Sequence, residues 1–241
     1  MRPSSGSAAT EKAQEAQDGP AIRVVTSVDA LLDDLPGVVV ECAGHEAIAT
    51  CGPALLAAGA DLVVASVGAL ADPALHTALS DAGMAESAGR MILPIGAIGG
   101  LDLLRMLALA GPLDVTYQGT KPPAAWKGSA AERVVDLDTL HAPVSVFSGS
   151  AREAARAYPK NANVVAALAL AGAGFERTRV ELVADPGATG NTHAYKVDSP
   201  LCHYRIDIKA HPSPENPRTS ATAAWSLLDE VRAALTLNRR R

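Results

Sequence analysis

The stretch YPKNANVVAALALAGAG, Tyr158 to Gly174, decides the fold of the second half of the chain. Its residues from Val164 to Leu170 are all apolar, which predicts a helix buried on every side. Lys160, Asn161 and Asn163 stand together at the N-terminal end, where an Asn side chain can cap the first turn and the helix dipole is positive. This cluster has two interpretations: a capped core helix with a solvated lysine, or a site for an anion.

The composition bounds the class of protein. The 241 residues are 48% hydrophobic and 20% charged, as expected of one large folded domain or two small ones. A net charge of −5, with no basic cluster before the terminal arginines, argues against a nucleic-acid-binding surface. No apolar run approaches the roughly 20 residues that span a bilayer, and no secretory signal is visible, so we expect no membrane partner. The three cysteines lack metal-ligand spacing, so we expect a cytoplasmic protein with reduced thiols and no metal.

The first hundred residues alternate short apolar strands with helices, which favours a doubly wound α/β layer. VVVEC has the uninterrupted apolar pattern of a strand buried on both faces of a parallel sheet. The helices expected here are a turn opened by Ser27, a helix from His45 to Ala58 and another from about Asp72. The strands expected here are Ile22–Val25, Val38–Cys42, Asp61–Ala65 and Arg90–Pro94.

The pattern changes after Leu101, and the rest of the chain predicts a second, α+β domain. A helix to Ala110 precedes the strands, and LCHYRIDIKA alternates like an antiparallel strand with one wetted face. The Pro-rich link at 211–217 leads to a final helix, Thr219–Leu235, whose apolar residues have helical spacing, so we expect it to pack on the N-terminal layer. The strands expected in this half lie near Asp114–Gly119, Val144–Ser148, Arg179–Ala184, Thr192–Asp198 and Leu201–Ala210.

Ligands of open α/β sheets bind beyond the carboxyl ends of the strands. Small residues occur at three such ends here, in CAGH, SVG and GAIGG, and together they favour a groove. The strand, G-x-G-x-x-G and helix of a dinucleotide site do not precede Ile22. His193, among small polar neighbours in NTHAY, is the histidine best suited to acid–base chemistry, with His45 as the rival.

Eight stretches of the chain match a known family in the family's own order: VVVECAGHEA, ASVGALAD, PIGAIGGLDLLR, KPPAAW, SGSAREAARAYPKNANVVAALALAGAGF, VELVADP, NTHAY and PSPENPRTSATAAWSLL. Through them the chain resembles the L-aspartate dehydrogenase family along most of its length. The resemblance implies a Rossmann domain that binds NAD or NADP, joined to an α+β catalytic domain. It also implies oxidation of L-aspartate to iminoaspartate, which feeds NAD biosynthesis or hydrolyses to oxaloacetate and ammonia.

Site residues follow from the resemblance position by position. Ala97 of GAIGG and Asn163 of PKNANV correspond to cofactor contacts, and His193 corresponds to the active-site histidine. Our own inference adds Lys160 as a ligand of a substrate carboxylate, with Lys121 as second choice. We also expect a homodimer built on the sheet of the second domain.

The chain departs from the family pattern at three places: the first strand–turn–helix unit is not found, Ile95 precedes GAIGG where serine is usual, and Gly190 precedes Asn191 where arginine is frequent. We therefore expect an α/β fold with an incomplete Rossmann-type parallel sheet. Residues 1–97 would form this part, with 217–241 packing back on it, and 98–216 the α+β catalytic domain. An alternative function is a truncated or degenerate family member that folds, oligomerises or binds a small anion without catalysis.

Overall fold

The computed structural model describes residues 22–211 and 220–238, except the side chain of Lys160, and divides the chain into two compact units, 1–34 and 35–241. In the first unit, the helix α2 (Val28–Leu32) begins after Ser27, whose side chain accepts a hydrogen bond from the Ala30 N–H, as expected. The predicted strand Ile22–Val25 is wrong. Those residues have no regular structure, and Ile22 and Val24 are exposed, so burial does not stabilise an extended conformation there.

A three-stranded parallel sheet opens the second unit, in the order β1-β2-β3. The strands are β1 (Val38–Glu41), β2 (Asp61–Val64) and β3 (Met91–Ile92). The helices that connect them are α3 (His45–Ala57), η2 (Val67–Ala71) and α4 (Pro73–Ala82). Strand β2 is buried along its whole length, as its central position requires. The prediction that VVVEC is buried on both faces is wrong, because β1 pairs with β2 alone among the described strands and its Val40 is exposed.

The rest of this unit is built on a five-stranded mixed sheet, in the order β5-β6-β4-β7-β8. Strands β4 and β6 run parallel, and the other neighbours pair antiparallel. The expected strands are all present, with bounds β4 (Asp114–Lys121), β5 (Val144–Ser150), β6 (Thr178–Ala184), β7 (Thr192–Asp198) and β8 (His203–Lys209). Two short 3-10 helices, η3 (Pro123–Trp126) and η4 (Ala130–Arg133), lie between β4 and β5.

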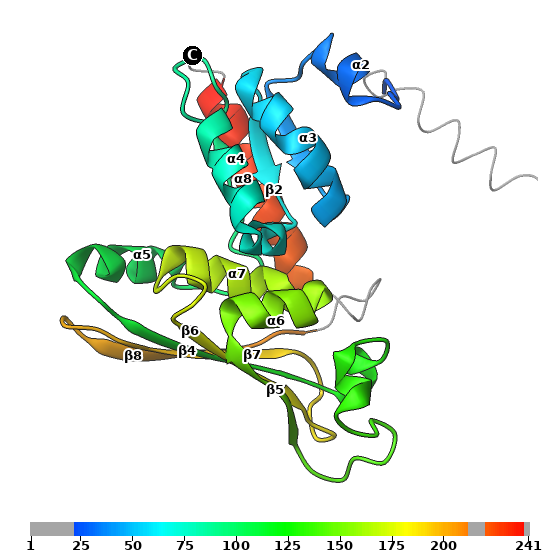
Figure 1. Ribbon diagram of the computed structural model, residues 1–241, viewed down its shortest axis with the longest axis vertical. Helices are drawn as coiled ribbons and strands as arrows, with labels where there is room; N and C mark the ends of the chain where they lie inside the picture. Colours follow the sequence, from blue (N-terminus) through cyan, green and yellow to red (C-terminus); the bar gives the residue numbers. More distant parts are fainter. Residues whose placement is uncertain (1–21, 212–219, 239–241) are drawn as a thin grey trace, which may run out of the picture. The chain divides into compact units, whose positions relative to one another are not determined.

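Three helices cover one face of this sheet, as Figure 1 shows: α5 (Leu101–Ala110), α6 (Ala151–Ala157) and α7 (Ala162–Ala171). The other face carries exposed polar residues such as Gln118 of β4, Lys196 of β7 and Arg205 of β8. On β4, the buried Val115, Tyr117 and Gly119 alternate with exposed residues, which shows that one face is packed and the other is not.

The central stretch of the sequence forms α7, preceded by the 3-10 turn η5 (Pro159–Asn161). Most of α7 is buried, but Val164 and Leu170 are only half-buried, so the prediction of burial on every side is wrong at these two positions. Asn161 occupies the N-cap position without a capping hydrogen bond from its side chain. Its amide oxygen instead accepts a hydrogen bond from the Lys121 ammonium group.

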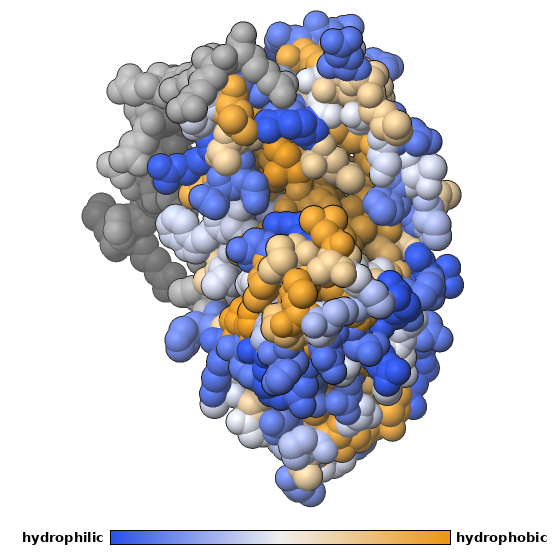
Figure 2. All heavy atoms as spheres, turned by 90° about the vertical axis from the view of Figure 1, so that its left-hand side faces the viewer, coloured by the Kyte–Doolittle hydropathy of each residue, from blue (hydrophilic) through white to orange (hydrophobic). Residues whose placement is uncertain are grey.

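The C-terminal helix α8 (Ala221–Asn238) packs against β1 and β2 of the parallel sheet. Its last residue, Asn238, donates a hydrogen bond to the carbonyl of Gly37 at 3.0 Å. Near its start, the Ser226 hydroxyl accepts a hydrogen bond of 2.8 Å from the Gly96 N–H. Figure 2 shows apolar residues gathered in a recessed band across the middle of the face in view. No helix in the described ranges is long and apolar enough to cross a membrane.

Candidate active site

A cavity of about 370 Å³ lies where the carboxyl ends of β2 and β3 meet the packed face of the five-stranded sheet. The starts of α7 and α8 complete its wall. Its lining is apolar except for a group of polar side chains, which are Lys121, Asn161, Asn163, Asn191, His193, Ser220 and the hydroxyl of Tyr117. Of the residues predicted for the site, Ala97, Asn163 and His193 line this one cavity.

His193 lies on β7 directly opposite Gly119 of β4, and it is buried. Its Nδ1 lies 2.7 Å from the hydroxyl oxygen of Tyr117, at hydrogen-bond distance. A Cβ on Gly119 would lie 2.6 Å from that hydroxyl oxygen, so a larger residue at position 119 would force the Tyr117 hydroxyl to shift. Sequence reasoning missed Tyr117 and Gly119, because their partnership with His193 depends on strand register.

Burial, with a smaller contribution from the nearby charge of Lys121, lowers the pKa of His193 to about 4. The imidazole is therefore neutral at neutral pH and has one nitrogen that can accept a proton. Burial also raises the pKa of Tyr117, so its hydroxyl stays protonated. When Nδ1–H donates to the Tyr117 oxygen, Nε2 carries the lone pair and acts as the proton acceptor.

We expect Tyr117→Phe to reduce turnover about fivefold, because one net hydrogen bond that orients His193 contributes about 1 kcal/mol. Gly119→Ala should lower turnover by at least as much, since its methyl group displaces the same hydroxyl. Steady-state rates of the two single variants and the double variant check this. The double variant should be no slower than the slower single variant, and losses that multiply would contradict a shared mechanism.

Lys121 ends β4 on the cavity side, and its ammonium group donates a hydrogen bond to Asn161. The Nζ atom lies 5.4 Å from the ring centroid of Trp126, a fully buried side chain of η3. Burial lowers the pKa of Lys121 to about 8. The sequence favours Lys160 over Lys121 as the ligand of a substrate carboxylate. The backbone of Lys160 lies in η5, and its side chain lies outside what the structure describes.

Asn163 joins the start of α7 to the loop after β2. Its Oδ1 accepts a hydrogen bond of 2.9 Å from the Gly68 N–H, and its Nδ2 donates one of 3.0 Å to the Ala65 carbonyl. Ala97 lies in the loop after β3 and is buried. Beside it, Gly96 has φ +67, and a Cβ built there would meet no atom within 4 Å. The backbone at this edge is therefore open to the close approach of a ligand.

Glu41, at the carboxyl end of β1, is a buried carboxylate that holds two loops of this edge. Its Oε1 accepts hydrogen bonds of 2.8 Å from the N–H groups of Ala43 and Gly44, and one of 3.0 Å from the Ser66 hydroxyl. Its Oε2 accepts the Ser66 N–H at 2.9 Å. Sequence reasoning missed this residue, although an acidic residue at the end of an apolar strand was a visible signal.

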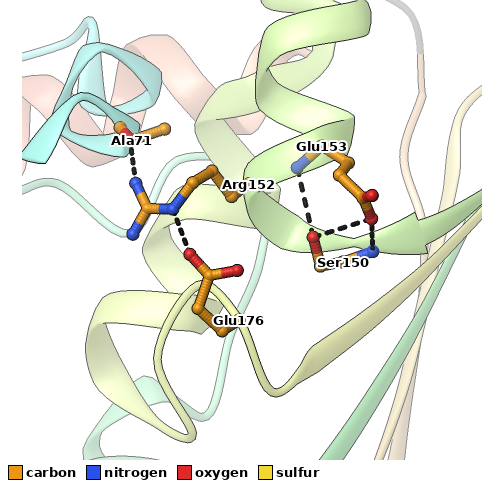
Figure 3. Close-up of polar contacts among 5 residues, drawn as sticks. All are labelled: Ala71, Ser150, Arg152, Glu153 and Glu176. Carbon is orange, nitrogen blue, oxygen red and sulfur yellow. Dashed lines mark hydrogen bonds and ion pairs between the residues drawn. The ribbon is translucent and has the colours of Figure 1, made fainter.

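Arg152 of α6 joins the helical layer to the end of η2, as Figure 3 shows. Its guanidinium donates to the carbonyl of Ala71 and forms an ion pair with Glu176. The helix itself begins with a reciprocal capping box between Ser150 and Glu153. Within the described ranges, no group of three or more His, Cys, Asp or Glu residues is placed to hold a metal ion.

The cavity sets a buried histidine of the five-stranded sheet beside the carboxyl edge of a parallel sheet, which is where open α/β sheets bind their ligands. Two family models identify the class as NAD-dependent dehydrogenases. A family model described as "Homoserine dehydrogenase, NAD binding domain" matches residues 5–93. A second, "Aspartate dehydrogenase, C-terminal", matches residues 102–234. The chain belongs to the aspartate dehydrogenase family.

Relatives and solved structures agree with this assignment. The chain is 49% identical to the L-aspartate dehydrogenase of Ruegeria pomeroyi, over 83% of this chain and 73% of that protein. It is 47% identical to L-aspartate dehydrogenase 2 of Bordetella pertussis, over 86% of this chain and 79% of that protein. The crystal structure of aspartate dehydrogenase from Thermotoga maritima is similar with a TM-score of 0.68 and 26% identity, covering 90% of this chain and 83% of that one.

Proposed function

We propose that this protein oxidises L-aspartate to iminoaspartate with NAD or NADP, and that iminoaspartate feeds NAD biosynthesis or hydrolyses to oxaloacetate and ammonia. The observation that carries the proposal is the placement of a buried neutral imidazole, His193, and a cation, Lys121, in one cavity at the carboxyl edge of the parallel sheet. The family membership supplies the identity of the substrate.

Ala97 and Asn163 would hold the nicotinamide end of the cofactor. The open backbone at Gly96 and the apolar wall around Ala97 fit a flat ring, and the Asn163 amide lies at the rim of the same cavity. When bound, the oxidised cofactor supplies the hydride acceptor for C2 of the substrate. The match of residues 5–93 to an NAD-binding family model supports a dinucleotide as the ligand of this part of the chain. Residues 1–97 with 217–241 would form the cofactor-binding part and 98–216 the catalytic part.

His193 would act as the general base. Its Nε2 accepts a proton from the ammonium group of L-aspartate, so that the amine can become an imine as C2 loses its hydride, or from the water that attacks the imine. The hydrogen bond between Nδ1 and Tyr117 holds the ring in place for this transfer. The apolar lining of the cavity limits the access of bulk water to the reacting carbon.

Lys160 remains a proposed ligand of a substrate carboxylate on the basis of its position before α7. We also propose a cytoplasmic homodimer that pairs through the open face of the five-stranded sheet. Support comes from the exposed side chains of both signs on that face, such as Arg179, Lys196 and Asp207. Sedimentation analysis tests the dimer, and a monomer at micromolar concentration would contradict it.

The proposed activity is tested with the purified chain by following the absorbance of reduced nicotinamide as L-aspartate is added with NAD or with NADP. We expect reduction that depends on L-aspartate, with oxaloacetate and ammonia as products. D-aspartate serves as the control for the stereochemistry at C2. A folded chain that binds the cofactor but shows no reduction with L-aspartate would contradict the proposal and favour the non-catalytic alternative.

A further inference from the structure

We propose that Lys121 binds a carboxylate of the acidic substrate through its ammonium group. The inference rests on the proposed function for the identity of that substrate. The binding of a carboxylate by Lys121 can be measured without turnover, because it concerns only a cation in a cavity and the anion that it can bind.

The register of the five-stranded sheet places Lys121 beside the proton acceptor. Tyr117, Gly119 and Lys121 alternate along β4 on the cavity side, and Gly119 pairs with His193 across the sheet. Lys121 therefore lies two residues, or about 7 Å, along β4 from the residue opposite the histidine. A small acidic substrate whose amino group faces His193 has a carboxylate within reach of a lysine side chain placed there.

The Lys121 ammonium group has donors to spare. An ammonium group donates three hydrogen bonds, and in the described part of the chain it makes one, to Asn161. The face of the Trp126 ring contributes a cation–π interaction but accepts no conventional hydrogen bond. None of the residues described as lining the cavity is acidic. A bound carboxylate would accept hydrogen bonds from the remaining N–H groups of Lys121, and its negative charge would balance the charge of the ammonium group.

The free-energy cost of burying the Lys121 charge also favours the binding of an anion beside it. Lys121 is half-buried, and burial lowers its pKa to about 8, which is the penalty of holding a charge away from water. A bound carboxylate offsets this penalty, so the pKa of Lys121 should rise in the complex. Because the Lys121 charge also lowers the pKa of His193, a carboxylate that neutralises it would make the imidazole a stronger base when substrate is present.

A purely structural role for Lys121 would be to tie β4 to the start of α7 through Asn161. Two variants separate the roles. Lys121→Gln keeps an amide N–H that can donate to the Asn161 oxygen but has no charge. Lys121→Met removes both the hydrogen bond and the charge. A structural role predicts that only the methionine variant is impaired, whereas carboxylate binding predicts that both are.

The test is a calorimetric titration with succinate, a dicarboxylate that has no amino group and is not oxidised by this reaction. We expect both Lys121 variants to bind succinate about 10- to 100-fold more weakly than the unmodified chain, as for loss of a charged hydrogen bond. Lys127→Met is the matched control, because Lys127 is an exposed lysine six positions further on that pairs with Asp138. It should leave the affinity unchanged. Unchanged affinity in a folded Lys121→Gln variant would overturn the proposal.

The pH dependence is a second readout. The titratable side chains among the described lining residues are Lys121 of β4, Tyr117 of the same strand and His193 of β7. Above about pH 6 His193 is neutral, and Tyr117 stays protonated through the range, so Lys121 alone changes charge. Succinate binding should be full between about pH 6 and about pH 8, where both carboxylates of succinate are ionised. It should decline as the pH rises through the pKa of Lys121 in the complex. The same decline in Lys121→Gln would contradict the assignment.

Substrate variation distinguishes the two carboxylates of L-aspartate. If Lys121 binds the side-chain carboxylate, Lys121→Gln lowers kcat/KM for L-aspartate but not for L-asparagine. If it binds the carboxylate on C2, both values fall together. Failure of the proposed function would appear differently, as an unmodified chain that binds succinate through Lys121 but oxidises neither amino acid.

Discussion

His193→Ala is expected to lower kcat for L-aspartate oxidation by about 10²- to 10⁴-fold, the range that general-base catalysis contributes. The imidazole is buried, neutral above about pH 4 and held by Tyr117, so it has the position and protonation state of a proton acceptor. Alanine leaves a space that water can fill but offers no base. Steady-state kinetics at saturating L-aspartate and cofactor measure the loss.

The control for this variant is His141→Ala, since His141 is exposed in the loop before β5. It should retain full turnover. Binding of NAD to His193→Ala, followed by calorimetry, should stay close to that of the unmodified chain, because the proposed role of the histidine is toward the substrate and not the cofactor. Turnover that survives His193→Ala, in an enzyme active on L-aspartate, would remove the catalytic assignment.

Glu41→Gln is expected to lower the free energy of unfolding by about 2–3 kcal/mol. The carboxylate accepts four hydrogen bonds in a buried position, through both of its oxygens. Glutamine can replace Oε1, but its NH₂ group then faces the Ser66 N–H, donor against donor, and one buried donor is left without an acceptor. Urea denaturation followed by circular dichroism measures the change.

Glu46→Gln provides the matched control, because Glu46 is exposed in the first turn of α3 and contributes mainly through the helix dipole. This substitution should lower the free energy of unfolding by less than about 1 kcal/mol. The affinity of Glu41→Gln for NAD should also fall, since Ala43, Gly44 and Ser66 lie at the edge of the sheet where the cofactor is proposed to bind. Equal stability of the two variants would show that the network around Glu41 contributes little.

The sequence predicted secondary structure best where a segment had a single clear hydrophobic period. The helix expected from Leu101 to Ala110 has those bounds in α5, because its apolar residues recur at helical spacing. The predicted alternation of β8 is also present, with exposed His203, Arg205, Asp207 and Lys209 between less exposed residues. Short edge segments were less predictable. Apolar composition alone suggested a strand at Ile22–Val25, but a strand needs a partner and a surface to bury.

The polar network of the site was harder to predict, because it depends on which strands become neighbours. The sequence favoured Lys160 over Lys121 as the substrate ligand, because only the antiparallel pairing of β4 with β7 places Lys121 near His193. Tyr117 likewise has no local signal. The capping box at Ser150 and Glu153 was different, because its S-x-x-E spacing was readable and was overlooked.

The placement of α8 has a consequence for how the protein is made. Of the described elements, α8 is the last to leave the ribosome, yet it covers β1 and β2 and supplies Ala223, Ala224 and Leu227 to the cavity wall. A nascent chain can complete the five-stranded sheet before this helix is available. Until α8 is synthesised, the parallel strands have an uncovered apolar face, as in the aggregation-prone intermediates of larger proteins. The cavity is thus closed by the last of the described elements to be synthesised, and a chain that stops before α8 has every proposed catalytic residue but no finished site.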